Sequence, residues 1–174
     1  MKYMNEVGKI KDKILPYLQG KIIDIGCADC KITPDAIGVD GRKMAGVDVM
    51  TDNVMQLSNI IPPRTADVVF SSHLLEHLTD DTAALKDWWL LLRDGGYLIL
   101  YLPDGRFYKN KENPEHIRDY NYHDFLFYFK QAFCGEGKDF RGNNLKQYFH
   151  LIESGEHNGE EELYSFWIVA QKVV

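Results

Sequence analysis

Cysteine is scarce in this sequence, and the three that occur do not suggest a disulfide-stabilised fold. They are Cys27, Cys30 and Cys134 among 174 residues. A small, odd number of thiols is typical of reduced cysteines rather than of a disulfide framework. Cys27 and Cys30 have C-x-x-C spacing, but a zinc site needs two more suitably spaced ligands and a thioredoxin-type pair opens a long helix. We therefore expect both to be small residues in a turn.

Long apolar runs and an excess of positive charge are also missing. No stretch is long enough to span a bilayer and Met1-Lys2-Tyr3 does not begin a signal peptide, so we expect a cytoplasmic protein with no membrane partner. A net charge of −6 lacks the basic footprint that binding to nucleic acid requires, so no nucleic-acid partner is expected. The 45% of hydrophobic residues predict a single domain over residues 1–174 with a substantial core.

An apolar segment that ends in an acidic residue and a glycine is the most informative feature present. The sequence Lys21-Ile22-Ile23-Asp24-Ile25-Gly26-Cys27-Ala28-Asp29-Cys30 predicts a buried parallel strand that opens into a turn lined by backbone groups. A second short strand over residues 37–39 ends at Asp40. This arrangement is typical of a nucleotide-type ligand site.

The composition of the turn indicates which ligand it suits. A dinucleotide site uses three glycines in G-x-G-x-x-G, so that backbone N–H groups can approach a pyrophosphate. Here only Gly26 is present, and Ala28 and Cys30 stand where further glycines would be. The carboxylates of Asp24 and Asp29 would repel a pyrophosphate but suit a ligand that carries an ammonium and a sulfonium group. The residues therefore favour S-adenosylmethionine over NAD.

Four stretches in order resemble the class I S-adenosylmethionine-dependent methyltransferases, and the resemblance covers residues 20–103. They are a degraded D-x-G-x-G-x-G from Asp24 to Cys30, the strand Ala66 to His73, the L-L-E-H-L run Leu74 to Leu78, and an L-(K/R)-x-G-G strand entry, Leu92 to Leu100. L-E-H-L is typical of the family's small-molecule and sugar-modifying branches, type 11-like enzymes among them. The resemblance implies an α/β, doubly wound Rossmann-like fold with a mostly parallel seven-stranded sheet and a C-terminal antiparallel hairpin.

Periodicity and breaker residues predict the remaining elements. We expect one helix over residues 5–19, a second from Thr79 or Asp80 to Leu92 that Gly95-Gly96 ends, and a third that begins after an Asn121 cap. Strands are expected at 47–49, 67–70, 97–102, 147–152 and 163–169. A polar loop is expected over residues 104–120. Thr33-Pro34 predicts one helical turn at most. Asp24 and Asp40 are only 16 residues apart, where a full crossover helix gives roughly 20. We therefore expect thin cover over the cofactor on that side.

The resemblance implies cofactor contacts at four strand ends. They are Asp24, Gly26, Cys27 and Ala28 after the first strand, Asp40 and Gly41 after the second, Asp52 and Asn53 after the third, and Ser71 and Ser72 at the end of the fourth. Asp40 would accept hydrogen bonds from both ribose hydroxyls, Asp24 would orient the methionine amino group, and Asp52 or Asn53 would meet the adenine amine. Asp40, Asp52 and Asn53 are also ordinary turn formers, and that alternative stays open.

His73, Glu76 and His77 have the spacing of one face of a helical turn just after the fourth strand. Three interpretations remain: a histidine is a general base; the three ligate a divalent cation, as E-x-x-E-H does in a related quinone-biosynthesis O-methyltransferase family; or Glu76 forms a capping box and His77 packs. His73 replaces that family's first glutamate, so we assign no metal ligand. His116 in the polar loop lies in a stretch that resembles the family's H-x-x-x-(F/Y)-(T/N) element. It is a second candidate base, beside Arg118 for an anionic group.

The predicted reaction is methyl transfer from S-adenosylmethionine to an oxygen or a nitrogen of a small-molecule acceptor. The predicted catalytic residues are His73, His77 and His116. The L-E-H-L branch and the acidic charge suggest a sugar or a cell-surface precursor as acceptor. The alternative is a protein that binds S-adenosylmethionine without catalysis, which would explain the degraded glycine turn.

Overall fold

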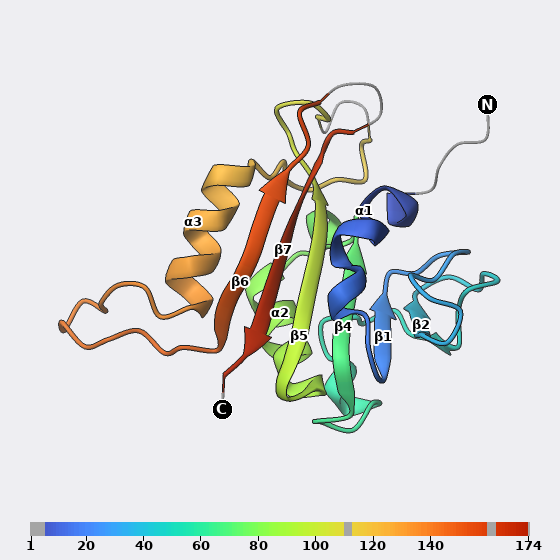
Figure 1. Cartoon of the computed structure of the whole chain (residues 1–174), viewed down its shortest axis with the longest axis horizontal. Coiled ribbons are helices and arrows are strands. Elements are labelled where there is room, and N and C mark those ends of the chain that lie inside the picture. The colour runs from blue at the N-terminus through green and yellow to red at the C-terminus, as the bar shows by residue number, and fades with distance from the viewer. Residues whose placement is uncertain (1–5, 110–112, 160–162, 174) are drawn as a thin grey trace.

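Seven strands form one mixed sheet in the order β3-β2-β1-β4-β5-β7-β6 (Figure 1). The computed structural model describes residues 6–109, 113–159 and 163–173. The strands are β1 Ile22–Ile25, β2 Ile37–Asp40, β3 Val49–Met50, β4 Ala66–Ser72, β5 Leu92–Pro103, β6 Phe149–Glu156 and β7 Ser165–Lys172. The first five pair in parallel, and β7 runs antiparallel to both β5 and β6. This sheet confirms the predicted fold class, including the closing antiparallel hairpin.

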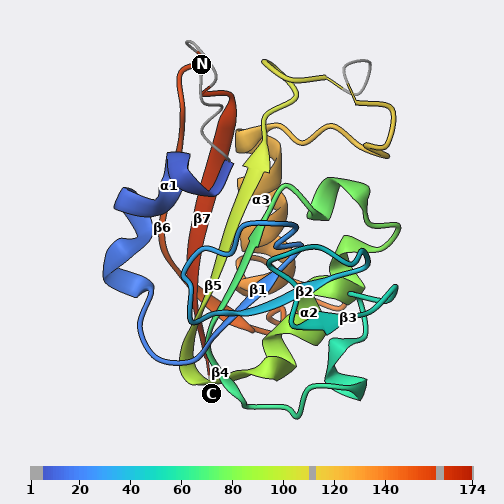
Figure 2. The ribbon, with the colours of Figure 1, turned by 90° about the vertical axis from the view of Figure 1, so that its right-hand side faces the viewer.

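Helices cover the two faces of the sheet unequally. Helix α1 (Glu6–Ile14) lies on one face, and α2 (Asp81–Leu91) and α3 (Tyr122–Phe133) lie on the other (Figure 2). Ile10 and Ile14 of α1 pack in the smaller core, whereas α2 and α3 contribute Trp88, Phe129 and others to the larger one. No helix in the described ranges has the length and apolar character needed to cross a bilayer.

Two helices begin where the sequence predicts. The Asp80 carboxylate accepts a hydrogen bond from the Ala83 N–H at 2.8 Å, and the Asn121 side chain accepts one from the His123 N–H at 3.0 Å. Each side chain satisfies a backbone donor that the first helical turn leaves free. These caps fix the starts of α2 and α3. The predicted start of the first helix, at residue 5, and residues 110–112 of the predicted loop lie outside the described residues.

Gly95 and Gly96 do not end a helix, which corrects the sequence-based prediction. Helix α2 ends at Leu91, and β5 begins at Leu92 and contains both glycines. The β4–β5 pairing passes from Ala66–Leu92 to Val68–Tyr97, so β5 bulges there. Gly95 has a φ of 74°, and a Cβ on Gly96 would lie 2.9 Å from the Asp67 carbonyl oxygen. The pair is therefore needed for the bulge rather than for a helix stop.

The segment between β1 and β2 contains no helix, so the predicted helical turn at Thr33-Pro34 is wrong. It forms an ordinary turn, with the Ala36 N–H donating to the Thr33 carbonyl at 3.1 Å. Residues 41–48 instead fold back beside β1 and β2, where the Cys27 thiol donates to the Gly46 carbonyl at 3.3 Å. The third strand is shorter and later than the predicted 47–49. A loop therefore covers this part of the sheet.

Candidate active site

The turn after β1 keeps the backbone shape of a glycine-rich turn with only one glycine. Gly26 has a φ of 81° and Ala28 a φ of 48°, so both are left-handed. The Gly26 N–H donates to the Val39 carbonyl at 2.7 Å, and the Ala28 N–H donates to Asp40 Oδ2 at 3.1 Å. Ala28 stands at the second glycine of D-x-G-x-G-x-G and adopts the conformation that glycine takes without strain. The degraded motif therefore still forms the turn.

Asp24 lies beneath this turn and is bonded to it. The side chain is buried, and its Oδ2 accepts a hydrogen bond from the Ile32 N–H at 2.6 Å. Burial raises the pKa of Asp24 to about 7, against the opposing effects of that hydrogen bond and of Lys31. In this structure Asp24 holds the far end of the turn. Its contact with a methionine amino group stays a prediction.

Asp40 ends β2 and forms the turn that was one of the two interpretations considered for it. Its Oδ1 accepts from the Arg42 N–H at 2.9 Å and its Oδ2 from the Ala28 N–H at 3.1 Å. The side chain is buried beside the turn, and each carboxylate oxygen has a further lone pair. Asp40 is thus a turn residue whose remaining acceptor capacity fits the ribose diol. Gly41 follows at the strand end, where a Cβ would lie 3.5 Å from the Thr51 carbonyl oxygen.

Of the other predicted cofactor residues, some make hydrogen bonds within the protein and others have side chains that are exposed or unpartnered. Asn53 Oδ1 accepts from the Met55 N–H at 3.2 Å, as a turn residue does, whereas Asp52 is exposed. The Ser71 hydroxyl donates to the Ile25 carbonyl at 3.0 Å. Ser72 Oγ is buried and has no hydrogen-bond partner among the described residues. An orphaned hydroxyl one residue past the β1–β4 pairing fits a polar ligand at this edge.

The thiol of Cys27 is part of the packing of this turn. Burial, with the nearby carboxylates of Asp24 and Asp40, raises the pKa of Cys27 to about 12. A thiol of that kind is not a thiolate near neutral pH, so it is a poor nucleophile and a poor metal ligand. The side chain acts as a small hydrogen-bonding residue.

The three predicted catalytic histidines surround one carboxylate. Glu76 Oε1 lies 4.0 Å from His73 Nδ1, 3.9 Å from His77 Nε2 and 3.8 Å from His116 Nε2. Glu76 and His77 belong to the 3-10 helix η3 (Leu75–His77), and His116 comes from the loop after β5. The Ile117 N–H donates to the Glu76 carbonyl at 3.1 Å and fixes the loop against η3. The fold thus brings together residues 40 positions apart.

Glu76 does not form the capping box that the spacing suggested. Neither carboxylate oxygen accepts a hydrogen bond from another described residue, and the His73 N–H donates instead to the Tyr101 carbonyl at 2.9 Å. His73 also precedes η3, with a left-handed φ of 50°, so the histidines do not share one helical turn. Burial raises the pKa of Glu76 to about 8, and the charge of Glu6 acts in the same direction. The carboxylate is therefore available to a proton or a cation.

Two of the histidines are neutral at pH 7. Burial, aided by the charge of Lys9, lowers the pKa of His73 to about 3. The pKa of His116 is lowered first by burial and then by His77. His73 Nε2 lies 2.9 Å from Ser165 Oγ and 3.4 Å from Glu6 Oε2. A neutral imidazole offers a lone pair to a proton or a cation, but a pKa of about 3 makes His73 a weak base at neutral pH.

No local sequence pattern predicts the groups that hold His73. Ser165 comes from β7, and Glu6 comes from α1, where it also accepts from Tyr164 Oη at 2.8 Å. These residues lie 92, 67 and 91 positions from His73 along the chain. Arg118, by contrast, was a candidate anion binder. Its guanidinium donates to Asp81 Oδ2 at 2.6 Å and to the Leu78 carbonyl at 3.0 Å, so it anchors the loop to the start of α2.

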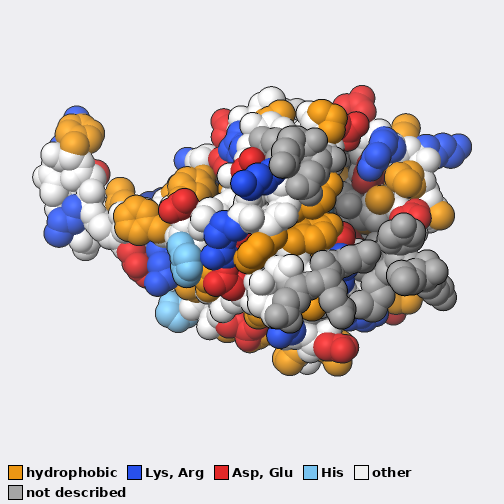
Figure 3. Space-filling model, turned by 90° about the horizontal axis from the view of Figure 1, so that it is seen from above, with side chains coloured by type: hydrophobic (Ala, Val, Ile, Leu, Met, Phe, Trp, Pro, Cys, Tyr) orange, Lys and Arg blue, Asp and Glu red, His pale blue; other side chains and the backbone are white. Residues whose placement is uncertain are grey.

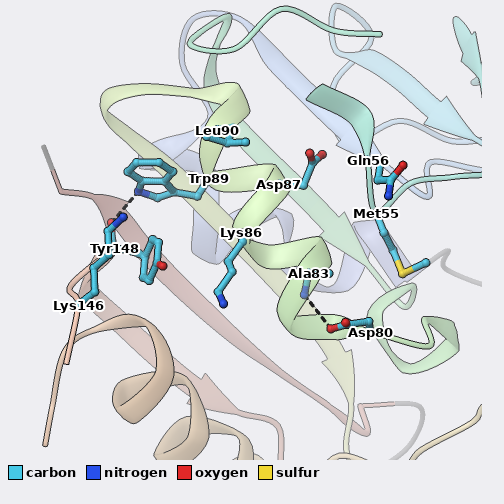
Figure 4. A pocket seen from close by; sticks show the side chains of 10 residues that line it. All are labelled: Met55, Gln56, Asp80, Ala83, Lys86, Asp87, Trp89, Leu90, Lys146 and Tyr148. Atoms are coloured by element: carbon cyan, nitrogen blue, oxygen red, sulfur yellow. Dashed lines mark hydrogen bonds between the residues drawn. The ribbon is translucent and has the colours of Figure 1, made fainter. Parts of the chain in front are cut away.

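A cavity of about 520 Å³ lies on the α2 side and does not coincide with this site. Figure 4 shows its lining side chains, which come from α2, from the segment before η2 (Leu57–Asn59) and from the residues before β6. Trp89 Nε1 donates to the Tyr148 carbonyl at 3.0 Å across one end. None of the predicted cofactor or catalytic residues lines it. The strand-end edge, not this cavity, is therefore the candidate active site.

Comparisons with known proteins agree with the fold and the motifs. A family model described as "Methyltransferase domain" matches residues 3–150. Among solved structures, a SAM-dependent methyltransferase from Thermotoga maritima has 18% identity and a TM-score of 0.66 over 96% of this chain and 87% of its own. One from Archaeoglobus fulgidus has 15% identity and a TM-score of 0.62 over 95% and 94%.

A third structure holds a ligand of the expected class. Burkholderia thailandensis 1,6-didemethyltoxoflavin-N1-methyltransferase, with bound 1,6-didemethyltoxoflavin and S-adenosylhomocysteine, has 11% identity and a TM-score of 0.69 over 98% of this chain and 79% of its own. No curated protein matches the sequence. The family match and the sheet order confirm the predicted family, cofactor and enzyme class. The chain belongs to the class I S-adenosylmethionine-dependent methyltransferases.

Proposed function

We propose that the chain transfers the methyl group of S-adenosylmethionine to an oxygen of a small molecule. The observation that carries this proposal is the cluster of His73, His77 and His116 around the buried Glu76 carboxylate, at the end of β4. A hydroxyl acceptor must lose its proton as it attacks, whereas an amine attacks through its own lone pair. Neutral imidazoles and an unpartnered carboxylate support an oxygen acceptor, and the acidic charge of the chain and the L-E-H-L run favour a sugar-like one.

The cofactor is proposed to lie along the carboxyl ends of β1, β2 and β4. The turn from Gly26 to Ala28 and the carboxylate of Asp24 would border the methionine end, Asp40 would accept from the ribose hydroxyls, and Asp52 would meet the adenine. The buried, unpartnered Ser72 hydroxyl supports a ligand at this edge. Bound S-adenosylmethionine supplies an electrophilic methyl group on its sulfonium.

The residues of the chain would align the acceptor with the cofactor and accept the proton that the acceptor loses. Strand ends β1 and β4 are paired at Ile25–Ser71, so the turn and the histidine cluster start from neighbouring positions of the sheet. His77 Nε2 and His116 Nε2 lie 3.9 and 3.8 Å from Glu76 Oε1, and one of these imidazoles would accept the proton that the acceptor hydroxyl loses. His73, held by Ser165, would position Glu76.

A thermal-shift and turnover experiment tests the proposal. S-adenosylmethionine and S-adenosylhomocysteine, at about one hundred times their dissociation constants, should each raise the stability by about 2.7 kcal/mol, and NAD should not. Release of S-adenosylhomocysteine should then be measured with a panel of sugar and phenol hydroxyls and with matched amines. No shift with either adenosyl ligand would refute the cofactor assignment. Binding without turnover on every acceptor would favour the non-catalytic alternative, and turnover on amines alone would refute the oxygen assignment.

A further inference from the structure

Glu76, His77 and His116 present three potential ligand atoms to one point. Glu76 Oε1 lies 3.9 Å from His77 Nε2 and 3.8 Å from His116 Nε2. One ligand atom from each of the three residues lies within 4.8 Å of the others. In a tetrahedral site with metal–nitrogen bonds of about 2.0 Å, ligand atoms are about 3.3 Å apart. The two Glu76 distances exceed this spacing by about half an ångström, and the ligand atoms of His77 and His116, which lie within 4.8 Å of each other, would also have to approach for the three residues to share a cation.

The Glu76 carboxylate lacks the partners that a buried charge requires. The side chain is fully buried, and neither oxygen accepts a hydrogen bond from another residue in the described ranges. A buried carboxylate without a hydrogen-bond partner is strongly unfavourable unless a proton or a cation neutralises it. Two imidazole nitrogens lie within 4 Å of the same oxygen, which is an arrangement that a shared cation would explain.

The hydrogen bond of His77 determines which of its ring nitrogens carries the proton, and so which one offers a lone pair near Glu76. His77 Nδ1 lies 3.0 Å from the Glu115 carbonyl oxygen, which can only accept, so Nδ1 carries the proton and Nε2 is unprotonated in the neutral ring. Histidines that ligate metals commonly donate their other N–H to a carbonyl in this way. The His116 ring packs edge-on against His77, with the ring centroids 4.6 Å apart, and against Tyr108. Both rings are thus held in place without a metal.

We propose that Glu76, His77 and His116 bind a divalent transition-metal cation, or zinc, through two imidazoles and one carboxylate. This donor set suits Zn²⁺, Co²⁺, Mn²⁺ or Fe²⁺ better than Mg²⁺ or Ca²⁺, which prefer oxygen ligands. Three protein ligands leave at least one coordination position open. His73 Nδ1 also lies 4.0 Å from Glu76 Oε1, but His73 does not belong to the three residues whose ligand atoms lie within 4.8 Å of one another.

The open coordination position would allow the acceptor hydroxyl to bind to the cation. This role of the cation in methyl transfer rests on the proposed function. An acceptor hydroxyl on the cation would lose its proton more readily, because a bound cation lowers the pKa of a coordinated oxygen. The methyl group would then pass to that oxygen as its bond to the cofactor sulfur breaks, and the released proton would leave to solvent. Metal binding by the protein alone does not depend on this step.

Cobalt titration of the chelator-treated protein tests the site directly. One equivalent of Co²⁺ should bind with visible d–d absorption, and Zn²⁺ should displace it. His116→Ala and Glu76→Gln should each weaken Co²⁺ binding at least tenfold, since each removes one of three ligands. His150→Ala, which removes an exposed histidine on β6, is the matched control and should leave the affinity unchanged. His77→Ala replaces Glu76→Gln if circular dichroism shows that the latter does not fold.

Three outcomes would overturn the proposal. They are the absence of stoichiometric Co²⁺ binding, an affinity unchanged in His116→Ala, and thiolate-to-cobalt absorption in the near ultraviolet, which would place the ion at the cysteines. The thermal shift with S-adenosylhomocysteine is measured on the same metal-free protein. A retained shift without cobalt binding would refute the metal site alone, whereas a lost shift with cobalt binding would refute only the cofactor assignment.

Discussion

Ala28 occupies a backbone conformation that glycine usually provides. Its φ of 48° places it in the left-handed region, and its N–H donates to Asp40. A non-glycine residue in that region is unfavourable by about 1–2 kcal/mol, and such strain persists where surrounding contacts require it. The contact with Asp40 joins the turn after β1 to the end of β2. Hydrogen bonds therefore hold the turn in its shape, although the motif lacks the glycines that usually allow that shape.

Ala28→Gly should therefore stabilise the protein. Relief of the left-handed strain exceeds the extra freedom of glycine in the unfolded chain, which is about 0.4–1 kcal/mol, so we expect a gain of about 0.5–1 kcal/mol in the free energy of unfolding. Chemical denaturation measures it. Ala83→Gly in α2 is the control and should destabilise by about 1 kcal/mol, because that alanine is helical. A loss of stability in Ala28→Gly would contradict the strain at this position.

The catalytic candidates show what residue types alone can predict. His73, His77 and His116 were all identifiable from the sequence, because each follows a strand end or lies in a loop of the family pattern. The central position of Glu76 was not, since a capping box needs only local spacing, whereas the observed arrangement depends on the loop that carries His116. The contacts of His73 with Ser165 and Glu6 depend on the sheet order and on α1, so no local pattern encodes them.

At the scale of elements, a loop replaces the crossover helix between β1 and β2. Gly38 allows it to approach, because a Cβ there would lie 1.9 Å from the Gly46 carbonyl oxygen and 2.7 Å from Cys27 Sγ. Asp48 strengthens the contact, since its Oδ2 accepts from the Gly38 N–H at 2.9 Å. In place of a covering helix, this side of the sheet has a loop whose backbone at Gly46 packs directly against the backbone of β2 at Gly38.

Gly38→Ala should disrupt this contact. The added methyl group meets backbone, which cannot rotate away, so we expect the free energy of unfolding to fall by about 1–3 kcal/mol. Gly41→Ala, at the end of the same strand, is the control. Its Cβ would meet nothing closer than 3.5 Å, so its effect should stay within about 0.5 kcal/mol. Equal stabilities of the two variants would show that the loop does not pack as described.

The boundaries of helices and strands were predictable where a local sequence signal is compatible with only one structure. Asp80 and Asn121 cap helices, and the sequence predicted both. Gly95-Gly96 has two possible uses, a helix stop or a strand bulge, and the choice depends on pairing with β4, which is not local. The missing helix after β1 followed from the short spacing, but the return of residues 41–48 did not, because it needs the close approach at Gly38.

At the scale of the whole molecule, the candidate residues gather at the edge where the parallel strands end. β1, β2 and β4 all end there, so residues from 24 to 116 meet although no single segment contains the site. An arm over residues 135–147 projects from between α3 and β6 (Figures 1 and 3). Its Phe140 is 91% exposed. The arm stands apart from the strand ends and contributes no residue to the proposed site.

The affinity for S-adenosylhomocysteine in Asp40→Asn, measured by titration calorimetry, tests the proposed cofactor site most directly. One amide oxygen cannot accept from both ribose hydroxyls while the turn N–H groups are also bound, so we predict at least a tenfold loss of affinity in a folded variant. Asp48→Asn, which alters the neighbouring loop contact but not the strand end, should bind as the wild type does. An unchanged affinity in Asp40→Asn would contradict cofactor binding at the end of β2.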